Sequence, residues 1–214
     1  MRSLLIIGAG GHGRVVADAA RHAGGWSRIE FFDERWPELQ SLDGHPVVGN
    51  LSQLLLRAAP VWPAGTDLIV ALGDNARRLA LSHEFAEKGA TLATVVHPSA
   101  VVSESVKLGA GSVVFAGAVI NPGSVIGRAG IVNTGALVDH DARIAEGVHV
   151  CPGVALAGGV SVGALAWIGI GSCVIQGVKI GERALVGAGS VVIRDVAPAT
   201  TVAGSPARKI RDAS

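Results

Sequence analysis

Aliphatic residues recur at every sixth position of the second half of the chain, from Val102 to Val192. All sixteen positions of this column hold Val, Leu or Ile. A second column, four residues after each of them, holds only small or β-branched residues, and a third, three residues after, is Gly at ten of sixteen positions. A helix repeats every 3.6 residues and a strand every 2, so neither explains a period of six. The pattern is typical of a hexapeptide parallel β-helix, in which each hexad forms one short strand and one corner.

The three columns predict different structural roles. We expect the aliphatic residue to point inward and the small residue to let the next wall come close. The Gly is expected to adopt the positive φ of a tight corner, at no Cβ cost. Three hexads per coil give about five coils. Residues 197–214 leave the register and are expected to cap the last coil, which would otherwise expose an open edge.

The first 92 residues follow a different pattern, in which apolar strands alternate with amphipathic helices. We predict strands at 3–8, 29–33 and 68–72, a short extended piece at 46–48, and helices at 14–23, 51–58 and 75–88. This alternation indicates βαβ units with a parallel sheet, about half of a dinucleotide-binding fold. The predicted organisation is a small half-Rossmann-like α/β domain (1–92), a β-helix domain (93–196) and a C-terminal cap or tail (197–214).

Residues outside the inward columns define three outer faces of the β-helix. Two faces are apolar and one is polar. The first apolar face contains Val113, Ile131, His149, Trp167 and Leu185, and the second contains Val119, Leu137, Ala155, Cys173 and Val191. The polar face contains Lys107, Val125, Arg143, Ser161 and Lys179. Contiguous apolar surface marks association. We therefore expect two faces to meet neighbouring subunits, in a cyclic homotrimer.

Bulk composition narrows the functional classes. The chain has 214 residues and a net charge of +1, so nothing draws it towards nucleic acid or an acidic membrane. No apolar run approaches a membrane span, and the N-terminus lacks the layout of a signal peptide. The two cysteines, Cys151 and Cys173, have no metal-site spacing around them. We expect a soluble cytoplasmic protein without a metal.

Four polar residues stand outside the inward columns: Asn133, His140, Asp141 and His149. His140 and Asp141 share one corner, and Asp141 occupies the Gly column, where Asp tolerates φ > 0. His149 lies on an apolar face. A His beside a carboxylate at a subunit seam suits general-base catalysis. The alternatives are a plain turn residue for Asp141 and an interfacial hydrogen bond for the histidine.

A glycine-rich loop, GAGGHG at 8–13, follows the first strand and precedes the first helix. It fits G-x-G-x-x-G through Gly8, Gly10 and Gly13, and Asp33 ends the second strand. Three interpretations stay open: NAD binding, the diphosphate of a nucleotide sugar with Asp33 or Glu34 near the ribose or base, and a tight structural turn. Gly73, Asp74 and Asn75 lie in the next βα turn, beside the same crevice.

The motifs together resemble the left-handed β-helix acyltransferases, in particular the bacterial nucleotide-4-amino-sugar N-acetyltransferases of the bacillosamine and perosamine pathways and the related sialic acid O-acetyltransferases. The resemblance extends over nearly the whole chain. It rests on IIGAGGHGRVV (6–16), ALGDNARR (71–78), HPSAVVS (97–103), NTGALVDHDARI (133–144), LAGGVSVG (156–163) and AGSPARKI (203–210).

This resemblance implies roles for individual residues. His140 would be the general base for the sugar amine, Asp141 would orient it, and Asn133 would approach the sugar. His149 and the Gly158 backbone would contact acetyl-CoA, as would the C-terminal segment with Ala203, Pro206 and Arg208. The nucleotide sugar would bind at Gly10, Gly11, His12 and Gly13, with Asp33, Glu34, Gly73, Asp74 and Asn75.

The implied function is transfer of acetyl from acetyl-CoA to the 4-amino group of a UDP- or GDP-linked 4-amino-4,6-dideoxy sugar, by direct attack and for glycan biosynthesis. Two other functions remain: a sugar O-acetyltransferase of the sialic acid type, and a non-catalytic nucleotide-sugar-binding trimer. The sequence leaves open the nucleotide, the sugar and the contact of the basic tail with coenzyme A.

Overall fold

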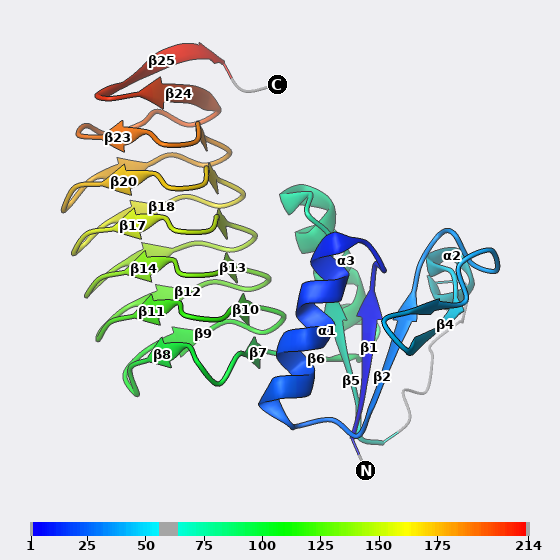
Figure 1. The fold of residues 1–214 in the computed structure, drawn as a ribbon. Coiled ribbons are helices and arrows are strands. Elements are labelled where there is room, and N and C mark those ends of the chain that lie inside the picture. The colour runs from blue at the N-terminus through cyan, green and yellow to red at the C-terminus, as the bar shows by residue number, and fades with distance from the viewer. Residues whose placement is uncertain (1, 56–63, 213–214) are drawn as a thin grey trace. The chain divides into compact units, whose positions relative to one another are not determined.

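The computed structural model describes residues 2–55 and 64–212. The chain divides into two compact units, Met1–Val95 and Val96–Ser214 (Figure 1). The first is an α/β unit and the second is a left-handed parallel β-helix, which confirms the predicted fold class. No helix among the described residues is long and apolar enough to cross a membrane.

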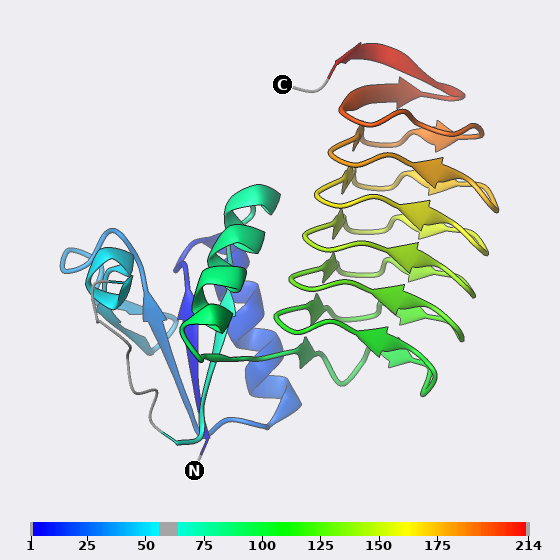
Figure 2. The ribbon, with the colours of Figure 1, turned by 180° about the vertical axis from the view of Figure 1, so that it is seen from behind.

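The first unit is built on a six-stranded sheet with the order β3-β4-β2-β1-β5-β6. β1 pairs in parallel with β2 and β5, and only β3 runs antiparallel to its neighbour. Helices α1 and α3 cover opposite faces of this sheet (Figure 2). The bounds are β1 Ser3–Ile7, α1 Gly11–Ala23, β2 Arg28–Phe32, β3 Ser41–Leu42, β4 His45–Gly49, α2 Leu51–Leu55, β5 Thr66–Val70, α3 Asn75–Glu87 and β6 Thr91–Leu92.

The predicted strands and helices of this unit are confirmed, with small shifts. Helix α1 begins at Gly11, three residues earlier than predicted, because the glycine loop itself supplies its first turn. The short strands β3 and β6 were not predicted, since two residues carry no periodicity. The last part of the helix predicted at 51–58, residues 56–58, lies outside the described residues.

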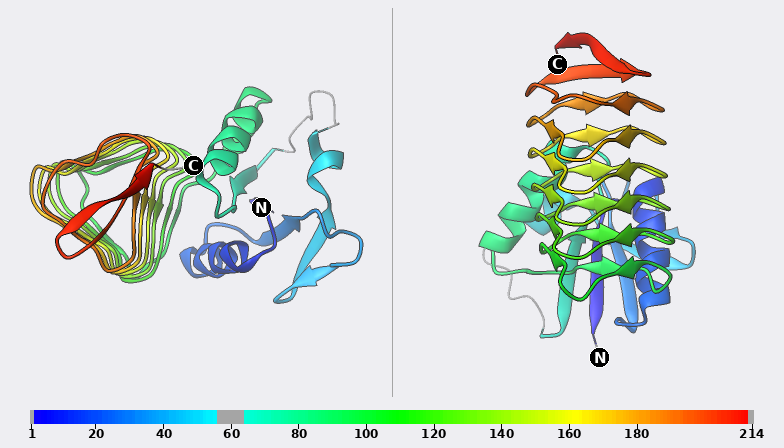
Figure 3. Two further views of the ribbon diagram at one scale, coloured as in Figure 1. Left: turned by 90° about the horizontal axis from the view of Figure 1, so that it is seen from above. Right: turned by 90° about the vertical axis from the view of Figure 1, so that its left-hand side faces the viewer.

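The β-helix stacks two-residue strands in three sheets. Each strand pairs in parallel with the strand eighteen residues later, as β10 with β13 and β14 with β17. Seen along the axis, the coils superimpose (Figure 3, left). The strands are β7 Val95–Val96, β8 Val101–Val102, β9 Lys107–Leu108, β10 Val113–Val114, β11 Val119–Ile120, β12 Val125–Ile126, β13 Ile131–Val132, β14 Leu137–Val138, β15 Arg143–Ile144, β16 His149–Val150, β17 Ala155–Leu156, β18 Ser161–Val162, β19 Trp167–Ile168, β20 Cys173–Val174, β21 Lys179–Ile180, β22 Leu185–Val186 and β23 Val191–Val192.

We name the faces by their strands. Face 1 contains β7, β10, β13, β16, β19 and β22; face 2 contains β8, β11, β14, β17, β20 and β23; face 3 contains β9, β12, β15, β18 and β21. The chain runs from face 1 through corner 1–2 to face 2, then through corner 2–3 to face 3, and returns through corner 3–1. Residues eighteen apart therefore lie on the same face or corner of adjacent coils.

The corners adopt the predicted positive φ. All ten Gly of that column have φ between 65° and 77°. Four other residues of the column share the conformation: Ala129, Asp141, Leu165 and Arg183, with φ between 51° and 62°. The corner geometry is therefore imposed by the repeat and does not depend on Gly at every position.

The inward columns form the core. From Val114 onward every member of the aliphatic column is buried. Serines of the small column are buried as well. Two of their hydroxyls donate to carbonyls of the next coil, Ser112 Oγ to Gly127 O at 2.9 Å and Ser124 Oγ to Asp139 O at 2.8 Å. A buried hydroxyl costs little when it is bonded in this way.

The C-terminal segment continues face 1. β24 (Thr200–Gly204) pairs in parallel with β22, and β25 (Ala207–Asp212) folds back antiparallel on β24. This hairpin satisfies the backbone groups that the edge of β22 would otherwise leave open.

The expectation that two apolar faces meet neighbouring subunits stays a prediction. On face 2, Val101 and Leu137 are 64% and 48% exposed. An exposed apolar face of this kind is what such an association would use.

Candidate active site

Corner 2–3 brings His140 and Asp141 together. His140 Nδ1 lies 2.9 Å from Asp141 Oδ2, and both side chains are largely exposed, at 61% and 65%. The positive φ of Asp141 is that of the Gly column, and its backbone N donates to Pro122 O in the preceding coil. The hydrogen bond that His140 makes to Asp141, followed by the charge of Asp139, raises the pKa of His140 above its ordinary value. With Nδ1 engaged, Nε2 is the ring nitrogen left to exchange a proton with a substrate.

Two glycines make room for this pair. A Cβ on Gly158, in the following coil, would lie 2.5 Å from His140 Nε2 and 2.7 Å from Cε1. A Cβ on Gly123, in the preceding coil, would lie 2.5 Å from Asp141 Oδ1. Real Cβ atoms do not approach so closely, so the imidazole and the carboxylate occupy a slot that only glycines leave open. The predicted contact of Gly158 with acetyl-CoA stays a prediction, and the structure places Gly158 against the His140 ring.

A further carboxylate, Asp139, supports the same corner and was not predicted. Asp139 Oδ1 accepts a hydrogen bond from the His140 backbone N at 2.8 Å and another from Asn121 Nδ2 at 2.9 Å. The Asn121 bond, followed by the His140 bond, lowers the pKa of Asp139. The signal was present in the sequence, because Asn121 and Asp139 are eighteen residues apart and therefore stack.

Asn133 and His149 form a second pair, between corner 1–2 and face 1. Thr134 N donates to Asn133 Oδ1 at 2.8 Å, which orients the amide. Asn133 Nδ2 therefore points at His149 Nε2, 3.0 Å away, and Nε2 must accept. This fixes a neutral His149 with its proton on Nδ1. The His149 ring is 7% exposed and contacts Trp167 edge-on, with ring centroids 4.3 Å apart.

Within one chain the two pairs are not brought together. His140 and Asp141 lie on corner 2–3, whereas Asn133 lies on corner 1–2, and strand β14 of face 2 separates them. The roles predicted for His140 and His149, at a site between subunits, stay predictions.

The predicted C-terminal contacts lie in the β24–β25 hairpin. Ala203 stacks on Gly187, since a Cβ on that glycine would lie 2.8 Å from Ala203 Cβ. Through the eighteen-residue repeat, Gly187 belongs to the same corner as Asn133. Pro206 is in the hairpin turn and Arg208 is exposed, with its guanidinium donating to Ala207 O at 3.0 Å. These residues do not contact His140.

The glycine loop of the first unit separates into structural and open positions. Gly8 has φ 105°, and a Cβ on Gly13 would collide with Gly8 O, so both are required by the turn. Gly10 and Gly11 have nothing within 4 Å of an added Cβ. They leave the N-terminus of α1 open, and α1 has no side-chain cap. An uncapped helix N-terminus with free space in front of it suits a phosphate group.

Asp33 is engaged within the chain. Its Oδ2 accepts from Ala9 N at 2.7 Å, and its Oδ1 accepts from Arg35 Nε at 2.7 Å. Arg35 in turn donates to Ala9 O at 2.8 Å. The Arg35 hydrogen bond holds the pKa of Asp33 below its usual value. Asp33, which was predicted to lie near the ribose or base, thus stabilises the glycine loop through its bond to Ala9 N.

Beside it, a cavity of about 260 Å³ opens at the carboxyl ends of the central strands. An apolar floor is rimmed by charged residues; the lining is Ile7, Gly8, Phe32, Asp33, Glu34, Arg35, Leu51, Leu72 and Arg77. Glu34 Oε1 lies 3.9 Å from Arg77 Nη2, and both are exposed. This is the crevice in which ligands bind in open α/β sheets. Of the predicted residues, Glu34 has the exposed carboxylate that a ligand in this cavity can reach.

The second βα turn is organised by a buried arginine. Arg78 is 1% exposed and donates to Leu72 O at 3.0 Å and to Asn75 Oδ1 at 2.9 Å. Asp74 caps α3 by accepting from Arg77 N at 2.7 Å. Asp74 and Asn75 therefore have structural partners, and Gly73 is the open position of this turn.

His12 does not supply the positive charge that a diphosphate contact would use. Desolvation by burial, followed by the charge of Arg78, lowers its pKa to about 4. At neutral pH it is an uncharged imidazole in the first turn of α1. Any attraction for phosphate at this loop comes from the helix N-terminus.

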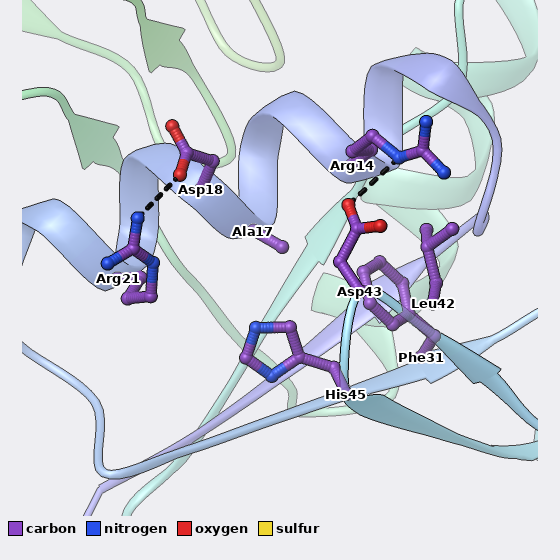
Figure 4. Close-up of a pocket in the computed structure, with 8 residues that line it drawn as sticks. All are labelled: Arg14, Ala17, Asp18, Arg21, Phe31, Leu42, Asp43 and His45. Carbon is purple, nitrogen blue, oxygen red and sulfur yellow. Dashed lines mark hydrogen bonds and ion pairs between the residues drawn. The ribbon is translucent and has the colours of Figure 1, made fainter.

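A second cavity of about 270 Å³ lies between α1 and the β3–β4 hairpin (Figure 4). Its charged groups pair with one another: Arg14 Nε lies 2.9 Å from Asp43 Oδ2, and Arg21 Nη2 lies 2.8 Å from Asp18 Oδ1. His45 completes the rim above Phe31. Among the described residues, no cluster of three or more His, Cys, Asp or Glu side chains is arranged to hold a metal ion.

Comparison with known proteins relates this architecture to solved enzymes. A family model of the PglD N-terminal domain matches residues 3–85. The acetyltransferase domain of PglB from Neisseria gonorrhoeae FA1090, solved with acetyl coenzyme A, is 41% identical, covers 98% of this chain and 99% of its own, and has a TM-score of 0.92.

Two structures from Caulobacter crescentus are similarly close. PerB in complex with CoA and GDP-perosamine is 42% identical, covers 98% of both chains and has a TM-score of 0.89. A variant of perosamine N-acetyltransferase with one histidine replaced by asparagine, bound to the same two molecules, is 42% identical over 99% of this chain and 98% of its own, with a TM-score of 0.91. The comparison with curated protein sequences found no match.

Because Gly158 and Gly123 leave the space that His140 and Asp141 occupy, we expect Gly158→Ala to displace the His140 ring. The weakened bond to Asp141 should let the pKa of His140 fall towards its ordinary value, measured by NMR titration of the ring. Gly163→Ala is the matched control, because its Cβ would meet the Glu182 backbone at corner 3–1. The control should lose stability and keep the His140 titration. An unchanged titration in Gly158→Ala would show that the slot does not hold the ring.

His12 predicts a pH-dependent stability. Its pKa is about 4 in the folded chain and 6.5 in the unfolded one, so the unfolded chain binds the proton more tightly. The stabilisation that neutral His12 gives to the folded chain is fully present above pH 6.5 and is lost as the pH falls towards 4. The free energy of unfolding, measured with urea, should drop by about 3 kcal/mol over this window. His12→Gln should remove this part of the slope, while His22→Gln, at an exposed site, should not. A full slope in His12→Gln contradicts the assignment.

Proposed function

This chain belongs to the hexapeptide-repeat sugar N-acetyltransferases, and we propose that it transfers acetyl from acetyl-CoA to the 4-amino group of a nucleotide-linked 4-amino-4,6-dideoxy sugar. The observation that carries the proposal is the His140–Asp141 pair, held in its glycine slot on a chain that matches PerB with GDP-perosamine and CoA end to end. The substituted histidine of the C. crescentus variant is one residue further along its chain than His140 is here.

In the proposed mechanism, the neutral sugar amine attacks the thioester carbonyl directly. A C–N bond forms, and the C–S bond breaks as the tetrahedral intermediate collapses. His140 Nε2 takes the proton from the nitrogen and returns it to the leaving thiolate, giving the amide and coenzyme A. Asp141 supports the imidazolium that exists in between. The resemblance implies that His149 lies near the thioester carbonyl, and Asn133 Nδ2 holds its ring through Nε2.

A covalent acetyl-cysteine route has little support. Burial raises the pKa of the Cys151 thiol to about 12, so the thiolate that would act as a nucleophile is not formed near neutral pH. Cys173 lies on the exposed face 2, away from both corner pairs. Direct transfer needs positioning and a base, and both are available at corner 2–3.

The nucleotide would bind at the first unit. The open N-terminus of α1 suits the diphosphate, and the cavity beside Glu34 suits the base. A cytoplasmic location is part of the proposal, since acetyl-CoA and nucleotide sugars are made there.

The proposed assembly is a homotrimer with active sites between subunits. His140 and Asn133 lie on the two corners that border face 2, with His149 beside Asn133 on face 1. Face 2 is apolar and exposed at Val101 and Leu137. A cyclic arrangement that buries face 2 brings corner 2–3 of one subunit beside corner 1–2 of the next. The two half-sites of each chain would then be completed by its neighbours.

The reaction is tested by coenzyme A release from acetyl-CoA with UDP-, GDP- and dTDP-linked 4-amino sugars. We expect release with at least one of them and a fall in kcat of about 100-fold in His140→Ala near neutral pH. In Asp141→Asn, the acid limb of the pH profile should move to lower pH, because the bond that raises the pKa of His140 is weakened. His22→Ala is the control.

Three outcomes would contradict the proposal. Release only with a sugar hydroxyl would favour O-acetylation. Nucleotide-sugar binding without release would favour a non-catalytic trimer. Binding of NAD as tight as that of a nucleotide sugar would reassign the glycine loop.

The shared site is tested by complementation. His140→Ala and His149→Ala each remove one half-site, and both proteins alone should be weakly active. When the two are unfolded and refolded together, about a quarter of the sites in a cyclic trimer should combine the intact halves. Recovery of roughly that share of the wild-type rate supports the shared site. No recovery in verified mixed trimers would place both histidines in the site of one chain.

A further inference from the structure

We propose that Asp139 is a positioning residue for His140, and that Asn121 in the preceding coil holds its carboxylate in place. This deepens the proposed function, on which its catalytic meaning rests. His140 is then fixed at two points by two carboxylates: Asp141 holds the ring and Asp139 holds the main chain.

The geometry is a stacked triad of polar groups at corner 2–3. Asp139 Oδ1 accepts two hydrogen bonds, from Asn121 Nδ2 at 2.9 Å and from the His140 backbone N at 2.8 Å. The Asp139 carbonyl is also held, since Ser124 Oγ donates to it at 2.8 Å. The preceding coil thus holds both the side chain and the backbone carbonyl of Asp139. Because the Asp139 carboxylate accepts from the His140 backbone N, the main chain of His140 is held in place as well.

The charges around His140 are few. Within its own corner there are two carboxylates, Asp139 and Asp141. From the preceding coil the corner receives Asn121, Pro122 and Gly123, and from the following coil Ala157, Gly158 and Gly159, none of them charged. Arg143 is the nearby cation, and its guanidinium donates to Gly123 O at 2.6 Å. Both carboxylates favour the imidazolium over the neutral ring.

The two carboxylates have separable effects. Asp141 acts through the hydrogen bond to Nδ1, which selects the tautomer with Nε2 free. Asp139 makes no bond to the ring, so its influence is the backbone clamp and its charge. During acetyl transfer the imidazole becomes positive, and a fixed charge that requires no reorganisation stabilises it at that moment.

Asp139→Asn separates charge from geometry. The asparagine oxygen can still accept from Asn121 and from the His140 backbone, so both hydrogen bonds can persist while the charge is lost. We expect the pKa of His140, titrated by NMR without substrate, to fall. The acid limb of kcat/KM should move to lower pH, and kcat should fall about 2- to 10-fold with the KM for acetyl-CoA nearly unchanged.

Asp195→Asn is the matched control. Asp195 lies on the same corner, three coils further on, and its Oδ1 likewise accepts a backbone hydrogen bond, from Lys179 N at 2.8 Å. The same charge is removed from the same edge of the β-helix, far from the ring. This variant should leave the His140 titration and the pH profile at their wild-type values.

Asn121→Ala tests the clamp. It removes one of the two donors to Asp139 and leaves the charge, so we expect a smaller shift in the same direction and a lower kcat. An unchanged His140 titration in Asp139→Asn, with only a lower melting temperature, would overturn the proposal and leave Asp139 as a purely structural residue. The NMR titration requires no acetyl transfer, so its result stands apart from the fate of the proposed reaction. A shifted titration in a chain without transferase activity would refute the function and keep the positioning role.

Discussion

The stacking of residues eighteen apart is the constraint on which the β-helix and its candidate site depend. Each coil must present an inward aliphatic residue and a small neighbour at fixed places, because parallel strands pair at a fixed spacing of about 4.8 Å. This fixes the register of every other residue as well. Asn121 and Asp139, Gly123 and Asp141, and His140 and Gly158 meet because each pair is eighteen residues apart. The residues of the candidate site thus lie outside the core, but the core repeat determines which of them meet.

The repeat also explains how much of the structure could be predicted. The β-helix, its corners and the outward direction of His140 follow from a period that sixteen hexads repeat without error. The positive φ of Asp141 followed from its column. The spacing of eighteen residues between Asn121 and Asp139 predicts that they stack, but a carboxylate among turn residues stands out only when it is compared with the same position of the preceding coil.

Other parts of the site depend on contacts that no periodicity encodes. The engagement of Asp33 by Arg35 and Ala9, the burial that leaves His12 uncharged, and the buried Arg78 all arise from side chains that meet through irregular turns. A motif such as G-x-G-x-x-G identifies which glycines a turn needs, but not which side chains near it remain available to a ligand.

The polar residues of the β-helix form two pairs in different environments. His140 lies at corner 2–3 beside two carboxylates that raise its pKa, whereas His149 on face 1 contacts the amide of Asn133. In the proposed reaction, a base that must accept a proton benefits from nearby carboxylates. If His149 contributed to the same site from corner 2–3, those carboxylates would favour its protonation as well. Separation across face 2 keeps the two environments apart, and the proposed assembly that buries this face would join them only where the substrates meet.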